Sequence, residues 1–195
     1  MAAFAEIGSY LADTIASLYL IIVVLRGILQ GSQADAYNPI SQFIARVTNP
    51  PLRLIRKVIP TGKRVDLSII VLALIVQATG MTAVIMLSGF MPPNPFIVLV
   101  WSALGVLGLL VNTYLVALIA MIVVSWIAPA SRHPAIILLY QITQPVMIPF
   151  RSLLPNMGGL DFSPILLFIL INVIQIALRH VAVATGLPIN LVMGI

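Results

Sequence analysis

The sequence contains no cysteine and very little charge. Without cysteine there are no disulfides, thiolate nucleophiles or cysteine-ligated metals. Only 8% of the 195 residues are charged, and no charged side chain occurs between Asp66 and Arg132. Soluble domains carry about 25% charged residues, and a transmembrane helix needs about 20 apolar ones. With 61% hydrophobic residues and a mean hydropathy of +1.15, the composition indicates an integral membrane protein.

Residues suited to catalysis are also scarce. The two histidines, His133 and His180, have no third ligand placed with them, so no metal site is expected. The five acidic residues form no close pair for general acid/base work, and no glycine-rich phosphate loop is present. The sequence therefore predicts no catalytic residues, no metal, no cofactor and no enzyme.

The positive charges that do occur are concentrated in one segment. Six of the ten cations lie there: Arg46, Arg53, Arg56, Lys57, Lys63 and Arg64. Such a cluster can bind nucleic acid or the anionic headgroups of a membrane. Apolar residues such as Leu52 and Ile55 alternate with these cations beside predicted membrane spans, so we expect lipid and no nucleic acid.

A motif recurs at a constant offset of 95 residues (134 − 39). Seven identities share this register: Pro39/Pro134, Thr48/Thr143, Pro50/Pro145, Arg56/Arg151, Pro60/Pro155, Asp66/Asp161 and Ser68/Ser163. Prolines and charges kept in register over this length indicate an internal duplication. We place the first repeat at residues 1–90 and the second at residues 91–195.

Each repeat is expected to contain two membrane-crossing helices joined by a pair of short amphipathic helices. The predicted crossings are residues 9–29, 67–87, 96–128 and 164–183, and the predicted pairs are residues 39–59 and 134–154. Asn49-Pro50-Pro51 is expected to divide the first pair into two helices. These pairs either lie in the headgroup region or dip into the bilayer as re-entrant hairpins. The fold class is therefore an all-α membrane protein with four transmembrane helices from two parallel tandem repeats.

Charge also predicts the orientation in the membrane. The segment between the first two crossings carries six cations against Asp35 and Asp66, which gives a net charge of +4. Positive loops stay in the cytoplasm. We therefore expect both interfacial segments on the cytoplasmic side and both termini outside.

Two ion pairs are predicted at equivalent positions. Arg56 and Asp66 are ten residues apart (66 − 56), as are Arg151 and Asp161. Because both partners recur, we favour a clamp that holds each interfacial helix to the next crossing helix. The alternative is that the arginines bind lipid phosphates. The expected lipid ligands are then Arg46, Arg53, Arg56, Lys57, Lys63, Arg64 and Arg151.

Polar residues inside the predicted spans have two interpretations. Asn172, Gln175 and Arg179 share one face of the last crossing, and Gln77 is the repeat counterpart of Asn172. Together with Asn112, these residues form either hydrogen-bonded contacts between helices or a polar path for ions. No acidic residue lies at mid-membrane to bind a cation, so we favour helix contacts.

The repeated motif resembles the YggT (YlmG-related) family of small multi-pass membrane proteins. The resemblance rests on residues 37–43 (YNPISQF), on Arg56 followed by residues 58–60 (VIP), and on residues 153–164 (LLPNMGGLDFSP). It covers essentially the whole chain, although the first repeat has residues 61–66 (TGKRVD) in place of the glycine pair. The resemblance implies a bacterial inner-membrane protein linked to osmotic tolerance, ion homeostasis, and envelope, division or nucleoid organisation.

We therefore expect a non-enzymatic membrane scaffold with a basic, lipid-facing cytoplasmic surface. Anionic lipids, further copies of the chain and proteins on the cytoplasmic face are its expected partners. The alternative is a subunit of an ion channel or transporter for monovalent cations.

Overall fold

The computed structural model describes residues 2–59, 66–153 and 161–187. These residues form six helices, in the order α1 (Ala2–Gly31), α2 (Pro39–Ile55), α3 (Leu67–Leu87), α4 (Pro95–Ile127), α5 (Pro134–Leu153) and α6 (Ser163–Ala184). Predicted sites at Lys63 and Arg64, and the repeated prolines Pro60 and Pro155, lie outside the described residues.

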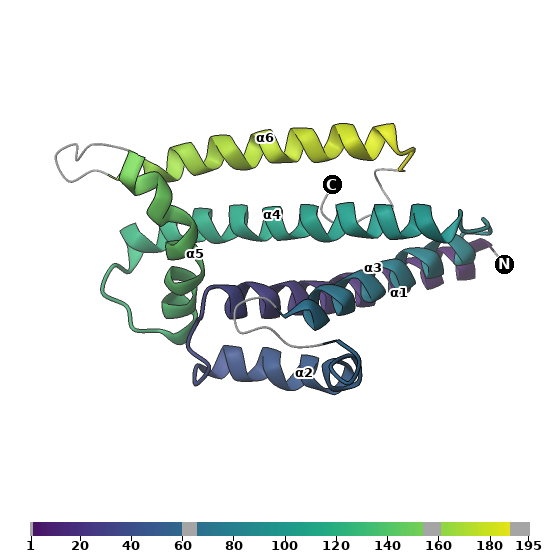
Figure 1. Ribbon diagram of the computed structural model, residues 1–195, viewed down its shortest axis with the longest axis horizontal. Helices are drawn as coiled ribbons and strands as arrows, with labels where there is room; N and C mark the ends of the chain where they lie inside the picture. The colour runs from purple at the N-terminus through teal and green to yellow at the C-terminus, as the bar shows by residue number, and fades with distance from the viewer. Residues whose placement is uncertain (1, 60–65, 154–160, 188–195) are drawn as a thin grey trace.

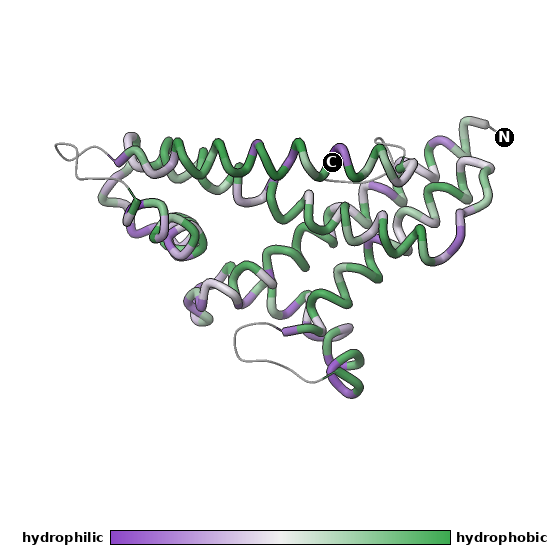
Figure 2. Tube along the Cα trace, turned by 45° about the horizontal axis from the view of Figure 1, so that its top comes forward, coloured by the Kyte–Doolittle hydropathy of each residue, from purple (hydrophilic) through white to green (hydrophobic). Residues whose placement is uncertain are grey.

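Four of these helices are long and apolar enough to cross a bilayer: α1, α3, α4 and α6. Hydrophobic residues dominate all four along their length (Figure 2). The predicted all-α fold with four membrane spans is thus confirmed. α1 begins at Ala2, well before the predicted start at residue 9. The predicted division between repeats at residues 90 and 91 falls in the connection between α3 and α4, and it stays a prediction.

The spans form two pairs. α1 and α3 lie side by side, and they are inclined to the pair α4 and α6 (Figures 1 and 2). α5 lies across the ends of α4 and α6, whereas α2 lies beside α1 and α3 and follows their direction in Figure 1.

Each predicted pair of short helices is in fact one helix, so the break expected at Asn49-Pro50-Pro51 is wrong. Pro50 and Pro51 lie inside α2, and Pro145 and Pro149 lie inside α5. A proline removes one helical hydrogen bond and crowds the carbonyl four residues earlier. Pro50, Pro145 and Pro149 are exposed, so the carbonyls they leave without a donor can find other donors outside the helix. Outer positions thus tolerate prolines.

Asparagine and aspartate side chains cap the starts of α2, α3 and α4. The side chain of Asn38 accepts a hydrogen bond from the Ile40 N–H at the start of α2, and Asn94 accepts one from Phe96 at the start of α4. Asp66 does the same for Ser68 at the start of α3. Such caps satisfy N–H groups that have no partner within the helix. Pro39 and Pro95 then occupy first-turn positions, where no N–H is needed.

The main hydrophobic core joins both repeats. It contains Leu20 and Val23 of α1, Leu52 of α2, Leu72 of α3, and residues of α4 and α5. A second cluster packs the end of α3 against the start of α4 and the end of α6, and a third packs α4 against α5 and α6. α4 belongs to all three clusters, and together with α5 it holds the second repeat against the first.

Candidate functional site

The first ion pair joins the end of α2 to the start of α3. Arg56 donates from Nε and Nη2 to the same oxygen, Oδ2 of Asp66, at 3.1 and 2.6 Å. The Asp66 side chain is 1% exposed and that of Arg56 is 29% exposed. The other oxygen of Asp66 accepts the Ser68 N–H at 3.0 Å. Asp66 thus caps α3 and pairs with Arg56 at once, so the charge of a buried carboxylate is neutralised.

The second ion pair repeats this geometry near the surface. Arg151 Nε donates to Asp161 Oδ2 at 2.9 Å, and Asp161 Oδ1 accepts the Ser163 N–H at 2.9 Å. Both side chains are more than 40% exposed. Both predicted pairs are present. Their role as clamps stays a prediction. Because the first pair is more buried than the second, we expect the first pair to contribute more to stability.

The second ion pair should make the stability of the fold depend on pH. Burial raises the pKa of Asp161, but hydrogen bonds from Ser163 and the Arg151 guanidinium outweigh it, so the pKa lies below the ordinary value of 3.8. Ionised Asp161 therefore contributes stability above pH 3.8, and that contribution is lost as the pH falls through the folded-state pKa. We expect Asp161→Asn to lower the melting temperature at neutral pH and to match wild type in strong acid. Thermal unfolding in detergent across this range checks it, and an unchanged difference in acid would contradict it.

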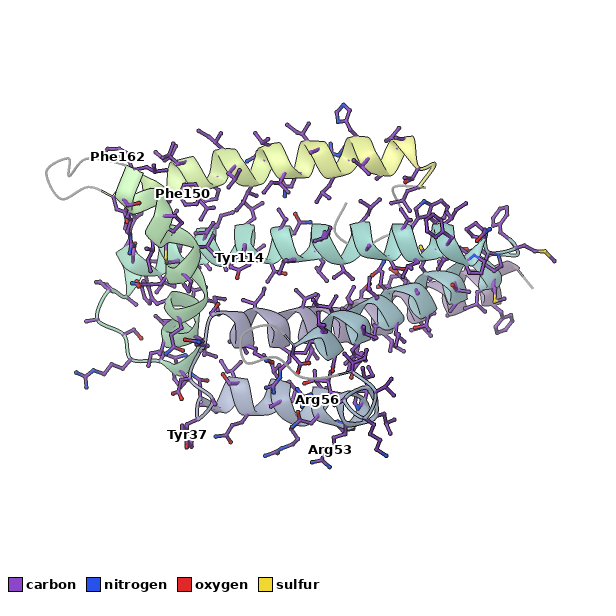
Figure 3. The ribbon with its side chains drawn as sticks, in the orientation of Figure 1. Tyr37, Arg53, Arg56, Tyr114, Phe150 and Phe162 are labelled. Carbon is purple, nitrogen blue, oxygen red and sulfur yellow. The ribbon has the colours of Figure 1, made fainter. Side chains whose placement is uncertain are left out.

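Three of the predicted lipid ligands form what we call the basic face: Arg46 and Arg53 on the exposed side of α2, and Lys57 in the turn that follows it. All three are exposed. Arg53 lies on the side of α2 away from the spans, and Arg56 lies closer to α3 (Figure 3). The predicted lipid ligands therefore fall into two groups, because Arg56 and Arg151 bind aspartates of the same chain whereas the basic face is exposed.

The starts of α2 and α5 are bonded to each other across the repeats. Asn38 Nδ2 donates to the Pro134 carbonyl at 2.9 Å, and the Asp35 N–H donates to Gln141 Oε1 at 2.9 Å. Pro134 is the repeat counterpart of Pro39, which follows Asn38 directly. The conspicuous asparagine-proline and histidine-proline pairs thus mark the junction of the two halves, a contact that sequence spacing alone does not reveal.

The predicted intramembrane polar residues are only partly brought together. Gln175 of α6 donates from Nε2 to Asn112 Oδ1 of α4 at 2.6 Å. Asn172 donates to the Phe168 carbonyl of its own helix, and both Asn172 and Arg179 are exposed. Gln77 is buried on α3, in the other repeat. The bond between Asn112 and Gln175 is a hydrogen bond between two spans, and the choice between helix contacts and an ion path stays a prediction.

The bond between Asn112 and Gln175 should contribute a modest coupling energy. Hydrogen bonds between transmembrane helices average about 0.6 kcal/mol and reach about 1.7 kcal/mol. We expect a double-mutant cycle of Asn112→Ala and Gln175→Ala to give a coupling energy within this range, measured by unfolding in mixed micelles. Pairing Asn112→Ala with the exposed Asn172→Ala is the matched control and should give no coupling. Equal coupling in both cycles would contradict the assignment.

One residue of this region was missed by sequence reasoning. Arg26 lies inside α1 and belongs to none of the predicted sites. Its Nε is buried and has no hydrogen-bond partner among the described residues. The signal was a lone cation inside a span, at a position whose repeat counterpart is the uncharged Met121.

These features define a multi-pass helical membrane protein built from a duplicated unit of two spans, a short helix and an ionic cap. The family model CCB3/YggT matches the chain twice, over residues 5–87 and 100–182. The chain therefore belongs to the CCB3/YggT family. The two matches confirm the tandem repeat and the predicted resemblance.

Relatives cover nearly the whole chain. Uncharacterized protein PA0392 of Pseudomonas aeruginosa is 43% identical over 182 residues, which is 92% of each chain. Uncharacterized protein YggT of Escherichia coli K12 is 34% identical over 91% of this chain and 92% of its own. A Vibrio alginolyticus relative is 34% identical over 83% of this chain and 87% of its own. No solved structure matches.

Proposed function

We propose that the chain is a non-enzymatic scaffold of the inner membrane, whose α2 binds anionic lipid and presents a cytoplasmic surface to partner proteins. The observation that carries this proposal is the division of α2 into three lengthwise stripes. Each stripe suits a different environment.

The stripes follow from helical spacing. Ser41, Ile44, Thr48 and Leu52 are buried against the rest of the protein. Phe43 and Leu54 are exposed apolar residues, 57% and 66% accessible, and they lie on the same side of α2 because eleven residues make about three helical turns. Arg46 and Arg53 of the basic face occupy the remaining side, and Lys57 follows in the next turn. A helix with a protein-facing side, an apolar side and a cationic side is suited to the boundary between lipid tails and headgroups.

Electrostatics gives this surface a preference among lipids. Each Lys or Arg near an anionic leaflet contributes about 1 kcal/mol, and placing a cation at the bilayer centre costs about 2.5–3.5 kcal/mol. Arg46, Arg53 and Lys57 are not bound by any carboxylate in the part of the chain that the structure describes. Their charges are thus available to phosphate headgroups, and they favour a position for α2 at the membrane boundary.

The lipid preference can be measured directly. The full chain is reconstituted with spin-labelled phosphatidylglycerol or phosphatidylcholine, and the motionally restricted fraction of each lipid is recorded. We expect wild type to restrict phosphatidylglycerol more strongly, and the triple variant Arg46→Gln/Arg53→Gln/Lys57→Gln to lose most of that preference. Arg132→Gln, an exposed cation outside α2, should keep it. Equal restriction of both lipids by wild type would refute the lipid-binding surface.

A flux assay separates the scaffold from the channel alternative. Liposomes that contain the purified chain should pass no potassium or sodium above protein-free liposomes. Flux that falls in Gln77→Ala, Asn112→Ala or Asn172→Ala would establish a conduit and overturn the scaffold.

The orientation is part of the proposal. The positive charge around α2 favours the cytoplasmic side for α2 and α5, with both termini outside. Reporter fusions at each terminus should give periplasmic signals, and a cytoplasmic signal at either end would reverse this topology.

A further inference from the structure

A cavity of about 280 Å³ lies between α1, α3 and α4. Its walls are mainly apolar, and they include Val24 and Ile28 of α1, Ile69 and Ala73 of α3, and Val106 and Leu110 of α4. It lies in the half of these spans that leads to α2, because its lining on α1 ends at Gly31 and its lining on α3 begins at Asp66. Both repeats contribute to it.

One end of this cavity is polar. Asp66, Gln30 and the tyrosine Tyr114 belong to its lining, and Tyr114 faces the space between α4 and α1 (Figure 3). Arg26 does not belong to this lining, but it lies one helical turn before Gln30 on α1.

Among the residues that the structure describes, the charges near this end do not balance. Arg56 is bonded to Asp66 at 2.6 Å and neutralises it. Arg26 is then left as a further positive charge, and its buried Nε has no hydrogen-bond partner among the described residues. A guanidinium inside a span is costly unless an anion compensates it, and an unused buried donor costs about 1–3 kcal/mol or more. The polar end therefore favours a negatively charged group.

We propose that the cavity holds part of one acyl chain of an anionic phospholipid, whose phosphate pairs with Arg26. The volume is slightly below the range of about 300–1,000 Å³ for sites that enclose a whole drug-sized ligand, so it suits one chain segment and not a complete lipid. Phospholipid is favoured over a free fatty acid because the polar end lies at the ends of the spans α1 and α3, at the depth of phospholipid headgroups. Arginine and phosphate form charge-assisted hydrogen bonds.

This site goes beyond the basic face of α2 and does not depend on it. Surface cations attract many exchanging lipids, whereas a cavity retains one lipid per chain. Neutralising Arg46, Arg53 and Lys57 should leave the retained lipid in place, so failure of either proposal can be recognised separately.

The test is native mass spectrometry of the full chain, released from nanodiscs that contain equal amounts of phosphatidylglycerol and phosphatidylcholine with the same acyl chains. We expect wild type to retain one phosphatidylglycerol. Ala73→Leu, which fills the cavity, should reduce retention at least about tenfold, equivalent to about 1.4 kcal/mol. The exposed Ala177→Leu of α6 is the matched control and should retain the lipid.

Two further variants guard against misfolding and locate the headgroup. In Gly27→Ala the added Cβ meets Ile69 Cγ2 at 3.5 Å, an ordinary contact, so this variant narrows the cavity in a folded protein and should retain less lipid. Arg26→Gln should lose the preference for phosphatidylglycerol, whereas Arg26→Lys should keep part of it.

Full retention in both Ala73→Leu and Gly27→Ala would overturn the cavity site, and an unchanged preference in Arg26→Gln would overturn the headgroup assignment. If oleate at equal concentration displaces phosphatidylglycerol, the ligand is a fatty acid, and the assignment of the site to a phospholipid is overturned.

Discussion

Replacing Gly80 by alanine should destabilise the contact between α1 and α3 by about 1–3 kcal/mol, the usual cost of overpacking a well-packed interface. A Cβ at this position would lie 2.5 Å from the Cβ of Ala16, which real structures do not tolerate without movement. Neither atom belongs to a flexible side-chain end, so the helices themselves must separate. Small residues at such crossings let membrane helices approach closely. A lowered melting temperature in detergent is the measurement.

The partner residue supplies a rescue. In Gly80→Ala/Ala16→Gly, the new Cβ would have only the residue 16 Cα near it, at 4.0 Å, so the double variant should recover most of the lost stability. Gly8→Ala is the matched control at the same helix pair, because its added Cβ would lie 3.9 Å from Leu87 and should be tolerated. A double variant as unstable as Gly80→Ala would show that this contact does not limit packing.

The second large effect is expected at the first ion pair. Arg56→Gln leaves the carboxylate of Asp66, 1% exposed, without its partner, and breaking a buried pair from one side costs about 3–5 kcal/mol. Arg151→Gln removes the equivalent partner of Asp161, which is 43% exposed, and exposed pairs contribute about 0–1 kcal/mol. Two substitutions that look equivalent in the repeat should therefore differ severalfold in their effect on unfolding in mixed micelles.

Removing the second charge tests the cause of this difference. Asparagine at position 66 can still cap α3, so Arg56→Gln/Asp66→Asn should recover much of the stability lost in Arg56→Gln. If the double variant is no better, the loss comes from the packing of Arg56 and not from an unpaired carboxylate. Equal losses for Arg56→Gln and Arg151→Gln would contradict the role assigned to burial.

The spans and the ion pairs could be predicted from the sequence because both depend on local or repeated patterns. The stretch from Asp66 to Arg132 without charge could only be accommodated by membrane helices, and the ten-residue spacing from Arg56 to Asp66 recurred with Asp161. Family matches and helix composition confirmed the four spans and the duplication.

The remaining features depend on how helices meet. The approach of Gly80 to Ala16 requires the register of two antiparallel helices, which neither sequence pattern specifies. The bond from Asn38 to Pro134 requires both repeats to be assembled. The prolines of α2 misled the prediction because their effect depends on exposure, and exposure follows from the side of the helix that packs inward.

The lengths of the spans have a consequence for the membrane itself. At about 1.5 Å per residue, α1 and α4 reach about 45 and 50 Å, whereas α3 and α6 reach only about 32 and 33 Å. A long helix adapts to a thin membrane by leaning, but a short helix cannot lengthen in a thick one. The ionic residues Asp66 and Asp161, fixed at the starts of α3 and α6, would then be drawn into hydrocarbon. The protein should therefore tolerate a thin bilayer better than a thick one. It should partition away from the thickest regions of a heterogeneous bilayer.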